Sequence, residues 1–154
     1  MSLALRSAAF EHGGEIPAFF TCEGRDLSPP LEWSGLPDGT VTLALIADDP
    51  DAPRGTWVHW IVYDIPAGQR GLREGMARLP NGARAGRNSW GRARYGGPCP
   101  PSGRHRYFFR LFALDCRIGP LETADKPDLL AAMEGHVLAT AELMGTYRKR
   151  GAST

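Results

Sequence analysis

The chain has 154 residues, 42% of them hydrophobic, and its 18 basic and 17 acidic side chains leave a net charge of +1. This length suits a single domain over residues 1–154 with a well-buried core, and the near-neutral charge excludes a general attraction to nucleic acid or to an acidic membrane surface. Any ligand must therefore be recognised at a local site.

The amino-terminal half of the chain alternates short apolar runs with turns rich in glycine and proline. The runs predict four strands, at residues 3–10, 31–33, 41–47 and 57–65. The last two are apolar on both alternating faces, which is typical of buried strands. They therefore frame the segment that lies between them.

The middle of the chain, residues 68–97, consists mostly of glycine, arginine, asparagine and proline, and we expect no core element there. Few aromatic residues accompany the arginines, so a solvated loop is a better interpretation than a nucleic-acid-binding tail. An apolar strand follows at Arg106–Leu114.

The carboxy-terminal part predicts a helix and then a strand. Leu130, Met133 and Val137 recur at helical spacing, which predicts a helix over Pro127–Leu138 whose opening proline suits a first turn. Residues 141–147 fit either a continued helix or a last strand, and we favour the strand. With 19 glycines and 13 prolines between many short strands, the sequence predicts a mainly β, sandwich-like fold with few helices.

An acidic turn connects the two central strands. Pro50 and Pro53 fix their φ angles and lack backbone donors, so they stiffen the turn and can hold its carboxylates in place. An aspartate between prolines commonly bonds its own turn, which is the expectation for Asp51. We therefore expect Asp49 to face a ligand.

Two histidines lie on strands beside large aromatic residues. Counting with a period of two places His59 on one strand face with Trp57 and Ile61, and places His105 on one face with Tyr107. For an isolated histidine, a hydrogen-bonded role in the core is the better interpretation. Two histidines together with the acidic turn favour a binding site, because pockets combine converging polar groups with apolar walls.

A second stiff loop precedes His105. Gly96 and Gly97 would let the backbone approach a ligand closely, and the prolines that follow stiffen the loop. If both loops meet at one end of the sheet, their donors suit a phosphate or a carboxylate. The polar side chains expected in that pocket are Asp49, His59, His105 and Tyr107. A nearby acid favours protonated histidines whereas burial opposes them, so the sequence leaves their charge state open.

The three cysteines, Cys22, Cys99 and Cys116, are far apart and form no Cys-x-x-Cys or zinc-ligand pattern. An odd and widely spaced set is typical of reduced thiols in the cytosol. The sequence shows no cleavable leader pattern and no apolar run of membrane-spanning length. We therefore expect a cytoplasmic protein without membrane insertion.

The motifs of both loops, in this order, resemble the phosphatidylethanolamine-binding protein family. They are Asp49-Pro-Asp-Ala-Pro53 with Trp57 and His59, then Gly97-Pro98 and Gly103-x-His-Arg-Tyr107. Ser28-Pro-Pro-Leu-Glu-Trp33, Gly135-His-Val-Leu-Ala139 and Gly145-Thr-Tyr147 resemble its bacterial branch, the Raf kinase inhibitor-like proteins. The resemblance spans nearly the whole chain.

This resemblance implies an antiparallel β-sandwich with a few short helices, an anion pocket, and no established catalytic reaction. It implies no cofactor and no metal, a kinase or protease as a protein partner, and assembly as a homodimer. The ligand-binding residues that it implies are Asp49, Ala52, Pro53, Trp57, His59, Gly97, Pro98, His105 and Tyr107.

Three functions are compatible with these residues. The first is a non-enzymatic protein that binds phosphate-bearing ligands, and the second is an interaction protein that regulates kinases or proteases. The third is a small hydrolase or metal-binding enzyme in which Asp49, His59 and His105 act as general bases or metal ligands. It ranks last because the chain lacks His-x-x-x-His, Gly-x-Ser-x-Gly and a nucleotide-binding glycine loop.

Overall fold

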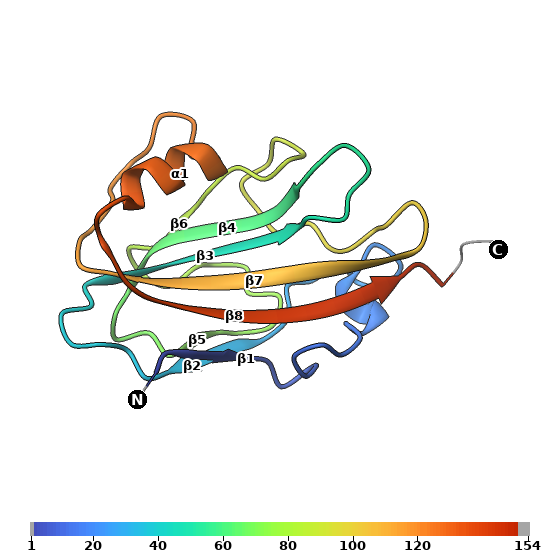
Figure 1. Cartoon of the computed structure of the whole chain (residues 1–154), viewed down its shortest axis with the longest axis horizontal. Helices are drawn as coiled ribbons and strands as arrows, with labels where there is room; N and C mark the ends of the chain where they lie inside the picture. Colours follow the sequence, from blue (N-terminus) through green and yellow to red (C-terminus); the bar gives the residue numbers. More distant parts are fainter. Residues whose placement is uncertain (1, 151–154) are drawn as a thin grey trace.

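Two antiparallel sheets pack face to face, and one helix covers the outer face of the larger sheet (Figure 1). The computed structural model describes residues 2–150. The larger sheet has the order β6-β4-β3-β7-β8 and consists of β3 (Thr42–Asp49), β4 (Trp57–Pro66), β6 (Arg84–Ala85), β7 (Arg104–Leu114) and β8 (Val137–Arg148). The smaller sheet has the order β1-β2-β5 and consists of β1 (Ala4–Arg6), β2 (Leu31–Ser34) and β5 (Gly71–Leu72). The helical elements are the 3-10 turn η1 (Ala18–Phe20) and the helix α1 (Lys126–Met133).

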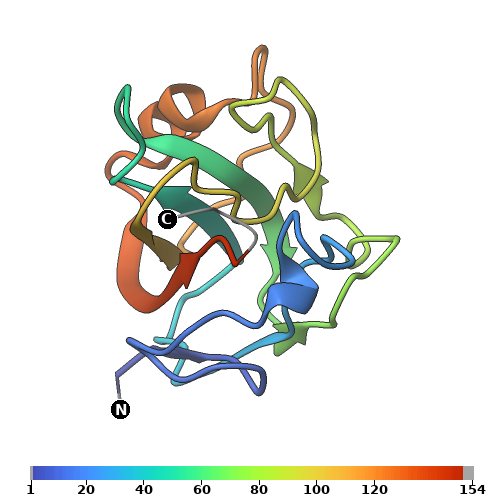
Figure 2. The ribbon, with the colours of Figure 1, turned by 90° about the vertical axis from the view of Figure 1, so that its right-hand side faces the viewer.

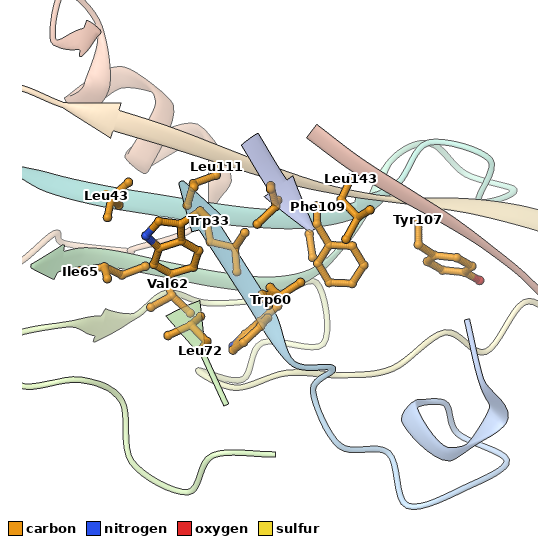
Figure 3. Close-up of a cluster of buried hydrophobic side chains, with 14 of the residues drawn as sticks. Trp33, Leu43, Trp60, Val62, Ile65, Leu72, Tyr107, Phe109, Leu111 and Leu143 are labelled. Carbon is orange, nitrogen blue, oxygen red and sulfur yellow. The ribbon is translucent and has the colours of Figure 1, made fainter. Parts of the chain in front are cut away.

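The main core lies between the two sheets (Figure 3). Trp33 of β2 packs into it beside Val62 and Phe109 of the larger sheet, and its indole N–H donates to the carbonyl of Gln69 at 2.8 Å. Burying each such large side chain contributes about 1.5–3 kcal/mol. This core fixes the smaller sheet against the larger one.

A second cluster lies between the larger sheet and α1. Ile61 and Tyr63 of β4 pack there against Leu129 and Met133 of the helix, and all four side chains are buried. Strands covered on both faces need apolar residues at successive positions, not only at alternate ones. This explains the continuous apolar runs, and it confirms the predicted buried strands at 41–47 and 57–65, except that Val41 precedes β3 and is exposed.

The carboxy-terminal prediction is confirmed for the last strand and wrong for the extent of the helix. Asp125 caps α1 by accepting from the N–H of Asp128 at 3.0 Å, but the helix ends at Met133. Val137 already belongs to β8, which pairs with β7, and Leu130 is 42% exposed. The apparent helical spacing therefore combined residues of two different elements.

The expectation that no core element lies within residues 68–97 is also wrong. Leu72 is 2% exposed and pairs with Leu31, which places β5 in the smaller sheet. A two-residue strand among glycines and arginines leaves no periodic signal in the sequence. The short strand β6 lies in the same stretch and forms one edge of the larger sheet.

The cysteines differ from their prediction as well. Cys22 and Cys99 form a disulfide with Cα atoms 5.5 Å apart, so the reduced-thiol interpretation is wrong for this pair. Cys116 is a free thiol. A bond across 77 residues depends on how the chain folds, so spacing along the sequence gave no sign of it. Within residues 2–150, no helix is long and apolar enough to cross a membrane.

Candidate functional site

A hollow of about 290 Å³ opens at the end of the larger sheet where β3 ends and β7 begins. Figure 2 views the molecule from this end, with η1 in blue and the loop that precedes β7 in yellow. The hollow combines polar side chains with aromatic and proline walls. Its lining residues are Asp49, Ala52, Trp57, His59, Trp90, Cys99, Pro100, Pro101, His105 and Tyr107.

Asp49 orients one of the two histidines. Its Oδ2 lies 2.6 Å from Nδ1 of His105, and both residues are buried. A carboxylate only accepts, so Nδ1 carries the proton and Nε2 of His105 is left for a ligand. The other oxygen of Asp49 accepts from the N–H of Asp51 at 2.8 Å. Asp49 therefore acts through His105 and has no donor of its own to offer an anion.

His59 reaches the hollow because of a β-bulge. Ala47 pairs with Trp60 and Asp48 pairs with Val58, so His59 has no opposite residue in β3. A bulge redirects the side chains around it. As a result, His59 contacts the ring of Tyr107 whereas Ile61 faces α1, and the prediction that His59 and Ile61 share a face is wrong.

The environment of His59 favours a neutral ring. Its Nδ1 donates to the carbonyl of Gly96 at 2.7 Å, which leaves Nε2 without a proton in the neutral form. Burial lowers the pKa of His59, and the bond to Gly96 and the charge of Asp49 oppose this only in part. The free protein therefore presents a neutral imidazole at neutral pH.

Tyr107 carries an unsatisfied donor between the two histidines. Its hydroxyl is buried and makes no hydrogen bond of normal geometry within residues 2–150, although the Asp49 carboxylate lies close to it. Burial, followed by the negative charge of Asp49, raises the pKa of Tyr107, so the hydroxyl keeps its proton. Its ring centroid lies 5.2 Å from that of His59 and 6.4 Å from that of His105. A buried polar atom without a partner is rare, which makes this hydroxyl the strongest sign of a binding site.

Trp90 forms a wall that the sequence analysis missed. Its ring contacts those of Trp57 and His59 edge-on, with centroids 5.4 and 5.1 Å away. The side chain of Asn88 accepts from the N–H of Trp90 at 3.0 Å. A Cβ on Gly96 would lie 2.3 Å from the Trp90 ring, so this glycine makes room for the indole. The sequence signal that could have identified Trp90 is a single large aromatic residue in a stretch otherwise rich in glycine and arginine.

The acidic turn is fixed to β7 at the rim of the hollow. Asp51 accepts from the backbone N–H and from Nε of Arg106 at 2.9 Å, and from Nη2 at 2.8 Å. The Arg106 guanidinium lowers the pKa of Asp51 to about 2. Asp51 thus has a structural role, as expected, but it bonds Arg106 of β7 and not the backbone of its own turn.

Six of the nine predicted ligand residues line the hollow, and Pro53, Gly97 and Pro98 do not. Pro53 lies in a neighbouring groove, and Pro98 is buried with its carbonyl accepting from Cys22. A Cβ on Gly97 would lie 2.3 Å from Oδ1 of Asp26, so this glycine serves loop packing. The lining residues absent from the prediction are Trp90, Cys99, Pro100 and Pro101. Cys99 is joined there to Cys22 by the disulfide.

Potential metal ligands gather elsewhere. Among residues 2–150, Asp115, Cys116 and His136 form the one group whose ligand atoms all lie within 4.8 Å of one another. They follow β7 and precede β8, at the opposite end of the sheet from the hollow. Asp49, His59 and His105 of the hollow do not form such a group.

Comparison with known proteins identifies similar chains. A family model described as phosphatidylethanolamine-binding protein matches residues 6–148. A UPF0098 protein of Methanothermobacter thermautotrophicus is 51% identical over 148 residues, covering 94% of this chain and 98% of its own. A UPF0098 protein of Aquifex aeolicus is 46% identical, covering 93% of this chain and 86% of its own.

Solved structures agree with the sequence matches. A phosphatidylethanolamine-binding protein homologue from Chlamydia trachomatis superposes with a TM-score of 0.91 at 44% identity, covering 96% of this chain and 98% of that one. E. coli YbcL is described as a new member of the mammalian phosphatidylethanolamine-binding protein family. It superposes with a TM-score of 0.90 at 33% identity, covering 97% of this chain and 100% of that one. The fold and the sequence thus point to the same relatives.

Proposed function

Because the chain belongs to the phosphatidylethanolamine-binding protein family, we propose that it is a non-enzymatic binding protein whose hollow holds a phosphate group. The phosphate is carried by a small molecule, such as a lipid headgroup, or by a phosphorylated side chain. The unsatisfied hydroxyl of Tyr107 between two oriented histidines is the observation that carries this proposal. A bound anion would give that hydroxyl its missing acceptor.

The proposed contacts follow from the hydrogen-bonding capacity of each group. The Tyr107 hydroxyl donates to a phosphate oxygen, and Nε2 of each histidine faces the ligand because Nδ1 is already engaged. A neutral Nε2 accepts from the P–OH of a monoanion, whereas a protonated one donates to a dianion. The Trp57 and Trp90 rings shield these bonds from water.

Calorimetry with phosphate, phosphoethanolamine and phosphotyrosine tests the proposal directly. We expect His105→Ala to weaken binding of all three about 10- to 100-fold, which corresponds to the loss of one charge-assisted hydrogen bond. His136→Ala is the matched control, because His136 also pairs with an aspartate but lies at the other end of the sheet. Equal binding by the parent and His105→Ala would contradict the proposal.

Binding of a dianion is expected to strengthen as the pH falls. The pKa of His59 is lowered in the free protein, and a bound dianion favours the protonated ring and raises it again. Binding therefore takes up a proton between the two pKa values, and affinity rises up to tenfold for each pH unit lost within that window.

Sulfate is the suitable probe for this effect, because it does not titrate between about pH 5 and 8, where histidine does. We expect calorimetry to show tighter sulfate binding at the acidic end of this range, and a shallower dependence in His59→Gln. A constant affinity for sulfate across the range would contradict the assignment of His59.

Several expectations from the family resemblance stay predictions. A kinase or protease partner is tested by pulldown with the parent and with an Asp49→Ala/His105→Ala variant. A homodimer is tested by light scattering, and the alternative of a small hydrolase or metal-binding enzyme is tested by a hydrolase panel with metal analysis.

The cytoplasmic location also stays a prediction. Disulfides persist mainly in oxidising compartments and in intracellular proteins of hyperthermophiles, so the bond between Cys22 and Cys99 removes one argument for an ordinary cytosol. Cell fractionation of the natural host, with thiols blocked at lysis, would establish both the compartment and the state of the bond.

A further inference from the structure

A second hollow, of about 540 Å³, adjoins the proposed phosphate site. It lies between the loop after η1 and the segment from Asn88 to Gly97, at the end of the molecule that Figure 2 views. Trp90 and Cys99 line both hollows, so these two residues lie at the boundary between them. A molecule seated in the first hollow could therefore extend directly into the second.

Three arginines are among the residues that line the second hollow. Arg25, Arg92 and Arg94 are exposed, and within residues 2–150 none of their side chains makes an ion pair or a hydrogen bond. One carboxylate faces them, that of Asp26, and its Oδ1 already accepts from the N–H of Gly97 at 2.8 Å. The balance of charge in this hollow thus favours an anion.

The position of two of these arginines is fixed from inside the protein. The side chain of Asn88, which is 5% exposed, accepts from the N–H of Arg92 at 3.0 Å and donates to the carbonyl of Arg94 at 2.6 Å. The Oδ1 atom of Asn88 also accepts a hydrogen bond from the backbone N–H of Trp90. One buried side chain therefore presents both arginines and the partition between the hollows as a unit.

We propose that the arginine-lined hollow binds a second anionic group of the ligand whose phosphate occupies the first hollow. The ligand is then a small molecule with two separated anionic groups, a phosphate and a second phosphate or carboxylate, that passes over Trp90. Guanidinium groups recognise both kinds of anion by paired, charge-assisted hydrogen bonds. This inference rests on the proposed function and specifies the ligand class for it.

Linear alkanediol bisphosphates of increasing length, from propane to octane, test the inference against the matching monophosphates by calorimetry. We expect one or more lengths to bind the parent at least tenfold more tightly than the monophosphate, since the second group binds at a high effective concentration. Arg92→Gln/Arg94→Gln removes this gain and leaves monophosphate affinity unchanged. Arg87→Gln, an exposed arginine of the same loop outside this hollow, is the control and keeps the gain.

The results separate failure of this inference from failure of the proposed function. Equal affinity for bisphosphates and monophosphates in the parent, with monophosphate binding still weakened in His105→Ala, would overturn the inference alone. A gain that survives Arg92→Gln/Arg94→Gln would also overturn it. The proposed function would be overturned if the parent bound no monophosphate, or if His105→Ala bound monophosphate with the same affinity as the parent.

Discussion

Replacing Cys22 and Cys99 by serine is expected to lower the free energy of unfolding by about 2–4 kcal/mol. The disulfide restricts the unfolded chain across a separation of 77 residues, and a longer closed loop gives a larger stabilisation. For a domain of this size the loss corresponds to roughly 5–15 °C in Tm. Urea unfolding should also show a larger m-value, because the unlinked chain exposes more surface.

Cys116→Ser is the control for this experiment, since Cys116 is a free thiol and its replacement leaves the cross-link intact. Thiol titration of the denatured, unreduced parent should find one thiol, whereas three would contradict the disulfide. The loops themselves should stay in place in the serine variant. Tyr95 still donates to the carbonyl of Phe20 at 2.8 Å, and Gly97 still donates to Asp26.

Tyr107→Phe is expected to weaken phosphate binding about tenfold or more while leaving the protein as stable as the parent or up to about 1 kcal/mol more stable. The variant loses one hydrogen bond to a charged ligand, which lowers affinity. It also loses a buried hydroxyl that has no partner in the free protein, and burying such a group is unfavourable. Calorimetry and urea unfolding measure the two effects separately.

Tyr147→Phe provides the contrast. Tyr147 is fully buried and pairs with His105 across β7 and β8, but its hydroxyl already donates to Glu23. Its loss should therefore destabilise the protein by about 1 kcal/mol and leave affinity nearly unchanged. If Tyr107→Phe instead behaved like Tyr147→Phe, the hydroxyl of Tyr107 would have a structural role and not a binding role.

The strands could be predicted because their pattern is local. Continuous apolar runs identified β3 and β4, and alternation favoured β8 over a continued helix. The burial of Leu72 was missed because its two-residue strand is defined by its pairing with β2, which lies far away in the sequence. Short elements whose partners are remote leave too little periodicity to detect.

The sequence predicted most of the residues that line the hollow, but it did not predict how their side chains are arranged. The histidines were placed by alternation, but only the pairing of β3 with β4 shows the bulge that turns His59 toward Tyr107. Trp90 and Cys99 come to the hollow through an asparagine-held loop and a disulfide, both of which are tertiary features. No spacing along the chain encodes either one.

Both loops around the proposed phosphate site are held before any ligand arrives. Asp51 fixes the first loop to Arg106, and Asn88 fixes the loop that bears Trp90. Because the conformational entropy of these loops is lost on folding and not on association, a small number of contacts can produce measurable affinity. A preorganised site of this kind selects ligands by their shape, because its loops do not rearrange to admit bulkier ones. Divergence of specificity would then proceed by substitutions in its walls, with the loop backbones unchanged.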